Sequence, residues 1–531
     1  IFLIVVSLIF IIFFKKNYKI IIINKYWWFL PAIFFFIESF TTNGYFSKVG
    51  GGAMNHWQPY IGVLQMMSQN GYLLWDTPSQ YGFLSLISLY LMPFSDPWIK
   101  LYFLNGCLNF FIGILFFKLC WNNNNNIFWY IISFLLTWSL FYLISGGPYF
   151  DNASNVPSDR PLRYVWIIII SYAMLIIKNK PYNNQLKIIL PLWLIGFLWS
   201  VESAFYVSSV IFPYLIYLLF FTNETIRKKI LMIASFPLLL ITAILLIFIY
   251  YYINIGHFPD LFSFIEYAVS WTGGFFSSEF NFTGTLWMPI IILSWIMLEF
   301  FYSENIKEKF LLLSFWSGLW ALCSYSIGQS EDVTMFRHGY LYFFFFFLVL
   351  KLTGFKKYKI FLLLPVFFSL ISFTFSSLYF FVHFHKTITN QNYNLKNTEH
   401  EIIDDYNQLL SLIEHNEIPL VYIEPGRYRF FNSKKIYIDK KTEKIINLND
   451  RIWLPLNPAI LMDPLMHERR KIYMKRWISR HNYSKGWIVN PISDHWHSDL
   501  YKLIDESLED YNKTKEFNYG KLKAILYEQK L

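Results

Sequence analysis

The chain has 531 residues, of which 55% are hydrophobic, 22% aromatic and only 15% charged, and its mean hydropathy is +0.36. This composition excludes a purely soluble globular protein, and the low content of Gly (23) and Pro (21) excludes a disordered or collagen-like chain. The formal net charge is +10, but no block of Lys and Arg is large enough to indicate nucleic-acid binding. Loop cations on the cytoplasmic side of a membrane protein explain the positive charge more simply.

The charged residues divide the chain into two predicted domains. Residues 1–382 contain 22 Lys and Arg and 15 Asp and Glu, whereas about 29% of the last 149 residues are charged. We therefore expect a transmembrane domain over 1–382 and a soluble α/β domain over 383–531. The three cysteines lie in or beside apolar segments, so the sequence offers no disulfide framework or cysteine-rich metal site.

Apolar runs predict eleven membrane-spanning helices and one partial helix. They cover residues 26–40, 98–118, 127–145, 163–177, 187–201, 203–221, 230–253, 286–302, 310–327, 339–353 and 360–382, with the partial run at 1–14. The expected fold class is mainly α: a polytopic α-helical membrane protein of about 11–12 spans with a small C-terminal extramembrane α/β domain. The apolar run 81–93 is not counted as a span, because counting it would invert every later loop.

The loops between these runs predict the orientation. One set of alternating loops contains 17 Lys and Arg and the opposite set only 5, so the first set is expected in the cytoplasm and the C-terminal domain outside. For a bacterial protein this means the inner membrane, with the C-terminal domain in the periplasm. Two outer loops are long, 41–97 and 254–285, and their aromatic residues predict short amphipathic helices on the membrane surface.

The C-terminal region shows the alternating pattern of a small α/β domain. Helices are expected at 397–415, 467–480 and 499–513, and strands at 419–424, 435–439, 486–490 and 521–528. The region contains no glycine-rich nucleotide-binding motif, so the sequence does not support catalysis by this domain alone.

The first candidate site residues lie at the start of the membrane domain. Glu38 ends an otherwise uncharged apolar run at the outer end of its helix, where an ionisable group is costly and is therefore a functional candidate. His56 and Asp76 follow in the first outer loop among Trp and Tyr residues, a combination that suits a sugar or a lipid headgroup. The alternatives are a helix-end acid that reaches the interface and an ordinary interfacial aromatic belt.

The second outer loop contains two acids between Pro and Gly residues. Asp151 and Asp159 can supply oxygen ligands to a divalent cation, Mg or Mn, placed over a phosphate leaving group. Arg160 and Arg163 can pair with the phosphate itself. A solvated loop with a local contact between Asp159 and Arg160 is the alternative.

Later outer segments contain further polar residues. Glu202 lies in a very short turn between two spans, where it is expected to face an internal cavity. Glu266 lies in the long loop 254–285, whose paired glycines are compatible with a hinge. Arg337 and His338 precede a Phe-rich span at headgroup depth, where a guanidinium suits a lipid phosphate, although a simple helix-end anchor is the alternative.

This layout resembles the GT-C class of integral-membrane glycosyltransferases. The shared features are an acid at the outer end of an early span (Glu38), a long first outer loop, an acidic second outer loop (Asp151, Asp159), a later outer loop with Glu266, and an outer C-terminal domain. The stretch from Trp75 to Phe83 is also similar to one in bacterial proteins of this type. The chain departs from the class in having Glu as its first acid and no Asp-x-Asp pair, which argues against protein N-glycosylation.

The resemblance implies a reaction and roles for the candidate residues. A polyprenyl-phosphate-linked sugar is the expected donor, and a glycan, a lipid or a protein is the expected acceptor. Glu38 is expected to be the general base. Asp151 or Asp159 through a metal, or Arg160 and Arg337 directly, neutralise the phosphate. His56, Asp76, Glu266 and His338 are expected to bind substrate.

Two other functions are compatible with the same pattern. An O-antigen ligase or polymerase also joins lipid-linked glycans outside the membrane but relies on a later Arg- and His-bearing loop. A transporter or flippase is expected to have internal repeats and ionisable groups in the middle of its spans. Such groups are rare here, and the best case, Glu299, lies near the end of its span, which argues against ion coupling.

Overall fold

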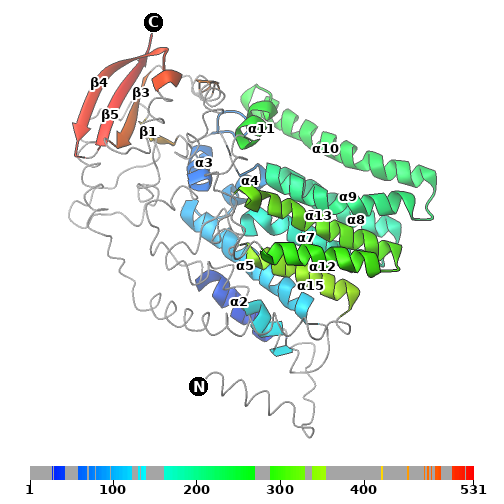
Figure 1. Ribbon diagram of the computed structural model, residues 1–531. Helices are drawn as coiled ribbons and strands as arrows, with labels where there is room; N and C mark the ends of the chain where they lie inside the picture. The colour runs from blue at the N-terminus through cyan, green and yellow to red at the C-terminus, as the bar shows by residue number, and fades with distance from the viewer. Residues whose placement is uncertain are drawn as a thin grey trace, which may run out of the picture.

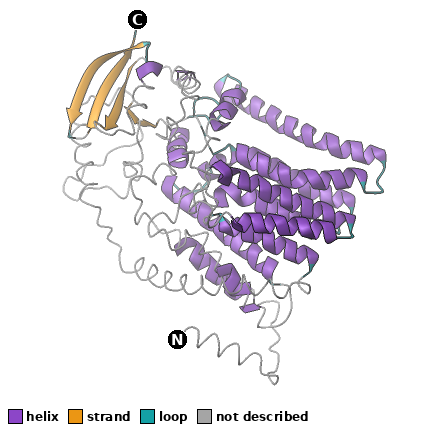
Figure 2. Cartoon of the chain, in the orientation of Figure 1, coloured by secondary structure: helices purple, strands orange, loops and turns teal. Residues whose placement is uncertain are grey.

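A computed structural model describes the chain in segments: residues 27, 29–41, 58–68, 71–77, 79, 81–95, 97–121, 130–131, 133–138, 161–269, 287–328, 338–354, 420–422, 451–453, 472, 475–476, 480, 485–491, 505–520 and 522–530. The structure is mainly helical, with a small sheet formed by C-terminal residues (Figures 1 and 2). The helices are α2 (Phe29–Thr41), α3 (Gln58–Ser68), α4 (Leu84–Tyr90), α5 (Pro97–Cys120), α7 (Pro161–Ile177), α8 (Tyr182–Trp199), α9 (Val201–Phe220), α10 (Ile226–Ile255), α11 (Leu261–Val269), α12 (Trp287–Tyr302), α13 (Ile306–Gly328) and α15 (Gly339–Thr353).

Among the described residues, three helices are long and apolar enough to cross a membrane. They are the Ile99–Cys120 part of α5, α9 and α10. Helices α7, α12 and α15 are apolar but shorter, with 15 to 17 residues each. These helices indicate an integral membrane protein, and their positions agree with the apolar runs predicted from the sequence.

The helical bundle is closely packed around α9 and α13. Small residues permit the close approach of neighbouring helices: an added Cβ at Gly196 of α8 would lie 2.7 Å from Val207 of α9, and one at Gly318 of α13 would lie 2.4 Å from Val210 of α9. Helix α10 lies at the edge of this bundle (Figure 1), and only 11% of its most apolar 18-residue window is buried. Its exposed Ile and Leu side chains are those expected of a lipid-facing helix.

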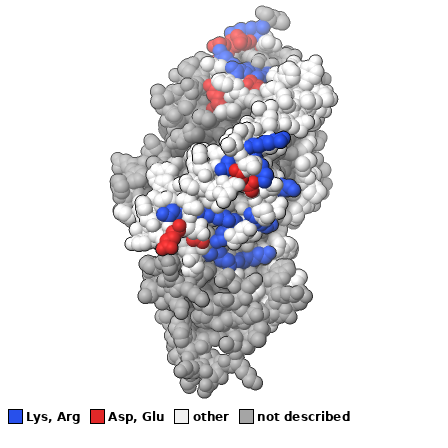
Figure 3. All heavy atoms as spheres, turned by 90° about the vertical axis from the view of Figure 1, so that its right-hand side faces the viewer, with Lys and Arg blue, Asp and Glu red and all other residues white. Residues whose placement is uncertain are grey.

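One end of the bundle is rich in cations, and we call it the cationic end (Figure 3). It includes the connections α7–α8, α9–α10 and α12–α13. Their cations are Lys178, Lys180, Arg227, Lys228, Lys229, Lys307 and Lys309, and their acids are Glu224, Glu304 and Glu308. The predicted loops 178–187, 222–229 and 303–309 therefore meet on one side, as the charge pattern requires.

The opposite end, which we call the loop end, is where α7, α9 and α15 begin. Both long loops place short helices there: α3 and α4 from the first, and α11 from the second (Figure 1). The run 81–93 contains α4, which has seven residues and spans roughly 10 Å at 1.5 Å per residue. This length is far below a membrane span, in agreement with the prediction.

The C-terminal strands form one mixed sheet in the order β2-β1-β3-β5-β4. The strands are β1 (Leu420–Tyr422), β2 (Arg451–Trp453), β3 (Lys485–Pro491), β4 (Tyr511–Tyr519) and β5 (Leu522–Gln529). Strand β1 is parallel to β2 and β3, and β5 lies between β3 and β4 and is antiparallel to both. Trp487 of β3 is almost fully buried. A small C-terminal sheet is therefore present, and the separate soluble α/β domain stays a prediction.

One predicted element of this domain was wrong in part. The sequence pattern predicts a helix at 499–513, but residues 511–513 begin strand β4 and only 505–507 are helical among those described. Strand β4 is polar and largely exposed, so it lacks the alternating apolar pattern that identifies a strand. Backbone pairing with β5 across a turn at Gly520, whose φ is 52°, determines its structure. The predicted elements at 397–415 and 435–439 lie outside the described residues.

Candidate functional site

A partly buried ion pair lies at the loop end of the bundle, between α7 and α9. Arg163 Nε donates to Glu202 Oε2 at 2.5 Å, and Arg163 Nη2 donates to Glu202 Oε1. The Arg163 side chain is 4% exposed and that of Glu202 is 33% exposed. This two-point contact fixes the guanidinium plane and compensates the cost of burying its charge.

The local sequence explains how Glu202 reaches this position. Ser200 is extended, with φ −158° and ψ 162°, so α8 ends at Trp199 and α9 begins at Val201. The Ser200 hydroxyl accepts the backbone N–H of Ser203 at 3.0 Å and caps α9. Glu202 lies in the first turn of α9, where the helix dipole also favours a carboxylate.

Two aromatic rings lie over Arg163, one from α7 itself and one from the first long loop, and further rings pack behind them. The rings of Tyr81 and Tyr164 each lie 5.4 Å from the Arg163 guanidinium carbon, a cation–π distance. Tyr60 of α3 stacks on Tyr81 at 4.8 Å, and the Tyr164 hydroxyl is hydrogen-bonded to His338 Nε2 at 3.2 Å. We call these residues the Arg163 cluster: Tyr60, Tyr81, Arg163, Tyr164, Glu202 and His338.

The loop that supplies Tyr81 is seated directly on the junction between α8 and α9. The backbone N–H of Phe83 donates to the Trp199 carbonyl at 3.1 Å, and Ser79 Oγ donates to the Gly82 carbonyl at 2.7 Å. Gly82 has φ +113°, and a Cβ there would lie 2.1 Å from the Trp199 carbonyl oxygen. Only glycine fits this contact, so the sequence of residues 79–83 fixes where Tyr81 lies.

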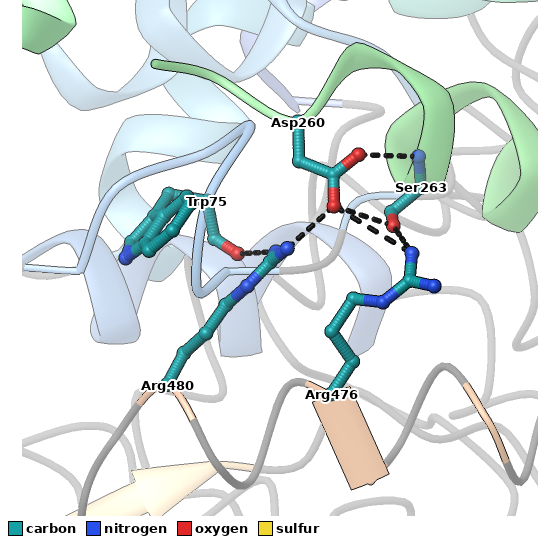
Figure 4. Close-up of polar contacts among 5 residues, drawn as sticks. All are labelled: Trp75, Asp260, Ser263, Arg476 and Arg480. Carbon is teal, nitrogen blue, oxygen red and sulfur yellow. Dashed lines mark hydrogen bonds and ion pairs between the residues drawn. The ribbon is translucent and has the colours of Figure 1, made fainter. Parts of the chain in front are cut away.

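A second polar cluster joins both long loops to the C-terminal region (Figure 4). The backbone N–H of Asp260 donates to the Leu74 carbonyl at 2.7 Å, which joins the two loops. Arg480 Nη2 donates to Asp260 Oδ2 at 2.5 Å, and Arg480 Nη1 donates to the Trp75 carbonyl. Arg476 donates to Ser263 Oγ and lies 3.6 Å from Asp260.

Aromatic stacking adds to this second cluster. The Arg480 guanidinium carbon lies 4.3 Å from the centre of the Trp75 ring, and His257 stacks on Trp75 at 4.7 Å with an interplanar angle of 8°. We call these residues the Asp260 clamp: Trp75, His257, Asp260, Ser263, Arg476 and Arg480. Because His257 and Arg480 both contact the Trp75 ring, this tryptophan links the first long loop to the second long loop and to the C-terminal region.

The electrostatics of Asp260 favour its charged form. Partial burial raises the pKa of this carboxyl, but hydrogen bonds from Ser263 and Arg480 together with the Arg480 charge outweigh burial. The pKa of Asp260 therefore lies below its ordinary value of 3.8. Asp260 is ionised at neutral pH and can act as the anionic partner of the clamp.

The structure places some of the predicted site residues and leaves others outside its description. His338 belongs to the Arg163 cluster. Asp76 lies in the turn after Trp75, where its Oδ1 accepts the Tyr72 backbone N–H at 2.6 Å and the Thr77 hydroxyl at 2.9 Å, so it stabilises the loop. Glu266 is half-buried on α11. The backbone of Glu38 lies in α2, but its side chain is outside the described residues, as are His56, Asp151, Asp159, Arg160 and Arg337.

No group of three or more His, Cys, Asp and Glu side chains able to bind a metal occurs within the parts of the chain that the structure describes. The predicted metal ligands Asp151 and Asp159 lie outside those parts. The metal prediction therefore remains a prediction.

Both clusters contain pairings that the sequence did not predict. Arg163 was expected to bind phosphate and Glu202 to face a cavity, but the two bind each other across 39 residues. Arg480 lies in the predicted basic helical segment 467–480, yet nothing in the local sequence indicates Asp260, 220 residues away, as its partner. Two sequence features could have drawn attention to these residues: the isolated position of Glu202 between two apolar runs, and the basic character of the C-terminal segment.

Comparison of the chain with protein-family models, with curated proteins and with solved structures finds no match.

Proposed function

We propose that this protein is a membrane glycosyltransferase of the GT-C type. It transfers a sugar from a polyprenyl-phosphate-type lipid to an acceptor on the outer face of the membrane. The observation that supports this proposal best is the Arg163 cluster, a polar and aromatic site at the end of an apolar bundle opposite the cationic end.

The position of the cluster suits a lipid-linked substrate. A polyprenyl chain is soluble only in the bilayer, so the phosphate and sugar that it carries lie at headgroup depth. The Arg163 cluster lies at the N-terminal ends of α7, α9 and α15, which is the corresponding depth in this bundle. The aromatic rings of the cluster are buried and packed against one another, so they support the site from beneath, and the Tyr164–His338 hydrogen bond helps to hold them in place.

The proposed chemistry is an inverting displacement. Glu38 takes the proton of an acceptor hydroxyl or amine, the acceptor atom forms a bond to the anomeric carbon, and the bond from that carbon to the phosphate oxygen breaks. The electron pair leaves with the polyprenyl phosphate, and the transition state has oxocarbenium character. Arg160 and Arg337 are the proposed cations for the phosphate. Asp151 and Asp159 are the proposed ligands of a Mg or Mn ion, which would supply further positive charge beside the phosphate.

Arg163 has a different role in this scheme from that of a phosphate ligand. Its guanidinium is bound at two points by Glu202, and its side chain is almost completely buried. We infer that Arg163 fixes the relative positions of α7, α9 and Tyr81, and so shapes the floor of the site.

The proposed localisation follows from the same arrangement. The cationic end faces the cytoplasm under the positive-inside rule, so the loop end and the C-terminal domain face the periplasm of a bacterial cell. We also propose that the whole chain crosses the membrane 11–12 times.

The test is a transfer assay with the full chain in lipid vesicles. Radiolabelled polyprenyl-phosphate sugars are supplied with glycan and lipid acceptors, and released polyprenyl phosphate is measured. We expect transfer by the wild-type protein, loss of at least about 10²-fold in Glu38→Gln, and wild-type activity in Glu304→Gln, the same change at the cationic end.

Other outcomes identify the rival functions. Full activity in Glu38→Gln together with loss in Arg337→Ala supports an O-antigen ligase or polymerase mechanism and contradicts Glu38 as the base. Movement of the lipid across the vesicle membrane without sugar transfer supports a transporter and contradicts the proposal.

A further inference from the structure

Loop 71–83 is fixed at both of its ends, and each end contacts a different cluster. At its start, the Trp75 carbonyl and ring contact Arg480 of the C-terminal region (Figure 4). At its end, Gly82 and Phe83 are seated on the α8–α9 junction, and the Tyr81 ring lies on Arg163. Trp75 and Tyr81 are only six residues apart, so displacement of one end is transmitted to the other over less than about 22 Å of extended chain.

Arg480 has the chemistry of a residue that joins separate segments. Its guanidinium contacts a carbonyl of the first outer loop, the carboxylate of Asp260 in the second, and the face of the Trp75 ring. The Arg480 side chain is 14% exposed and that of Asp260 is 19% exposed, so water competes little for these contacts. A planar group with five donors can satisfy these partners together, whereas the point charge of Lys cannot.

We propose that Arg480 is a positioning residue through which the C-terminal domain becomes part of the outer-face site. When the domain is docked, Arg480 fixes loop 71–83 and thereby keeps Tyr81 on the Arg163 guanidinium. When the domain is released, Trp75 loses its carbonyl partner and the Arg480 contact on its ring but keeps the stack with His257, so the loop that carries Tyr81 loses one of its anchors. The activity part of this inference rests on the proposed function, but the docking part does not.

The docking part is tested by a distance measurement that needs no substrate. Spin labels are attached through Phe258→Cys in the second outer loop and Ile472→Cys beside the arginines, both exposed positions, at 59% and 55%. We expect a narrow distance distribution in the parent protein and a broad, longer one in Arg480→Ala. Asp260→Asn, which retains an oxygen to accept the Ser263 N–H but loses the charge, is expected to broaden it as well.

Lys475→Ala is the matched control. Lys475 belongs to the same segment, but it pairs with Glu509 inside the C-terminal domain at an exposed position. Its distribution is expected to stay narrow. Narrow distance distributions in both Arg480→Ala and Asp260→Asn would overturn the inference. The two variants remove opposite partners of the same ion pair, so the test still stands if one of them fails to fold.

The activity part is read from the kinetic constants of the transfer assay. A displaced binding loop is expected to lower kcat/KM about 10²-fold in Arg480→Ala, mainly through KM, with no rescue in Arg480→Lys and no change in Lys475→Ala. Undocking without any change in kcat/KM would overturn the link to the site. If the wild-type protein transfers no sugar, the proposed function fails, while the distance measurement still decides whether Arg480 docks the domain.

Discussion

At the scale of single residues, the charged side chains of the Arg163 cluster and of the Asp260 clamp are paired with one another. Arg163 and Glu202 satisfy each other at two points, and Asp260 receives donors from Ser263 and Arg480. The sequence pattern predicts functional roles for Glu202 and Arg163 and shows a basic C-terminal segment. It could not identify the partners, because a pairing across 39 or 220 residues depends on the tertiary fold and leaves no local pattern.

Removing one member of the Arg163–Glu202 pair is expected to destabilise the bundle. In Glu202→Ala the Arg163 charge stays buried without its counter-ion, and we expect a loss of about 2–3 kcal/mol, below the range for fully buried pairs because Glu202 is one-third exposed. Thermal unfolding of the wild-type protein and of Glu202→Ala in detergent measures this loss of stability. Glu224→Ala, which removes an exposed i,i+4 pair with Lys228, should cost at most about 0.5 kcal/mol, and equal losses in the two variants would contradict the assigned role.

The pH dependence of docking is set by Asp260. Its pKa is lowered in the folded protein, so the ion pair with Arg480 contributes fully above the ordinary value of 3.8 and is lost as the pH falls through the lower folded value. The distance between labels at 258 and 472 should therefore stay constant from about pH 8 to about pH 5 and broaden only below about pH 4. Broadening near neutral pH would show that a different group controls the contact.

At the scale of helices and strands, apolar runs located the helices well, and tertiary contacts determined the remainder. The break between two helices near Glu202 was predicted correctly, because the apolar pattern is interrupted at Ser200, although Glu202 itself lies in the first turn of α9. Strand β4 was missed because most of its residues are polar and exposed, and it forms by pairing with β5. Loop 71–83 packs on the α8–α9 junction only because Gly82 has no Cβ that would clash with the Trp199 carbonyl oxygen. This requirement cannot be recognised from the sequence, because it depends on where Trp199 lies in the fold.

Two glycines with positive φ provide a matched test of the contact between loop 71–83 and the α8–α9 junction. Gly82→Ala places a Cβ 2.1 Å from the Trp199 carbonyl oxygen, so the loop must leave the α8–α9 junction, and we expect a loss of at least about 3 kcal/mol. Gly256→Ala has φ +72° but nothing within 4 Å of the added Cβ, so it should cost only about 1–2 kcal/mol of backbone strain. Thermal unfolding compares the two, and a smaller loss for Gly82→Ala would contradict this contact.

At the scale of the whole molecule, the distribution of charge gives the bundle two different ends. Cations gather at one end (Figure 3), and the two polar clusters lie at the other with the short loop helices. The loop charges predicted this asymmetry, because loops rich in Lys and Arg alternate along the chain with loops that contain few of them. They did not predict that the C-terminal domain contributes Arg480 to the loop end.

The orientation is checked by labelling single cysteines from one side of intact vesicles. Each variant also replaces Cys107, Cys120 and Cys323 by Ser. A membrane-impermeant thiol reagent should reach Phe258→Cys only from the side of the C-terminal domain, and Lys228→Cys only from the opposite side. Labelling of both positions from the same side would contradict the assignment of the two ends.

The central claim is that sugar transfer occurs at the loop end of the bundle, on the side of the C-terminal domain. The most direct test uses vesicles in which all copies have one known orientation, a polyprenyl-phosphate sugar in the bilayer and a membrane-impermeant acceptor added on one side only. The account predicts labelled acceptor when it is added on the side from which Phe258→Cys is labelled, and none when it is added on the other side. Transfer only on the side of the cationic end, or no transfer on either side, would contradict it.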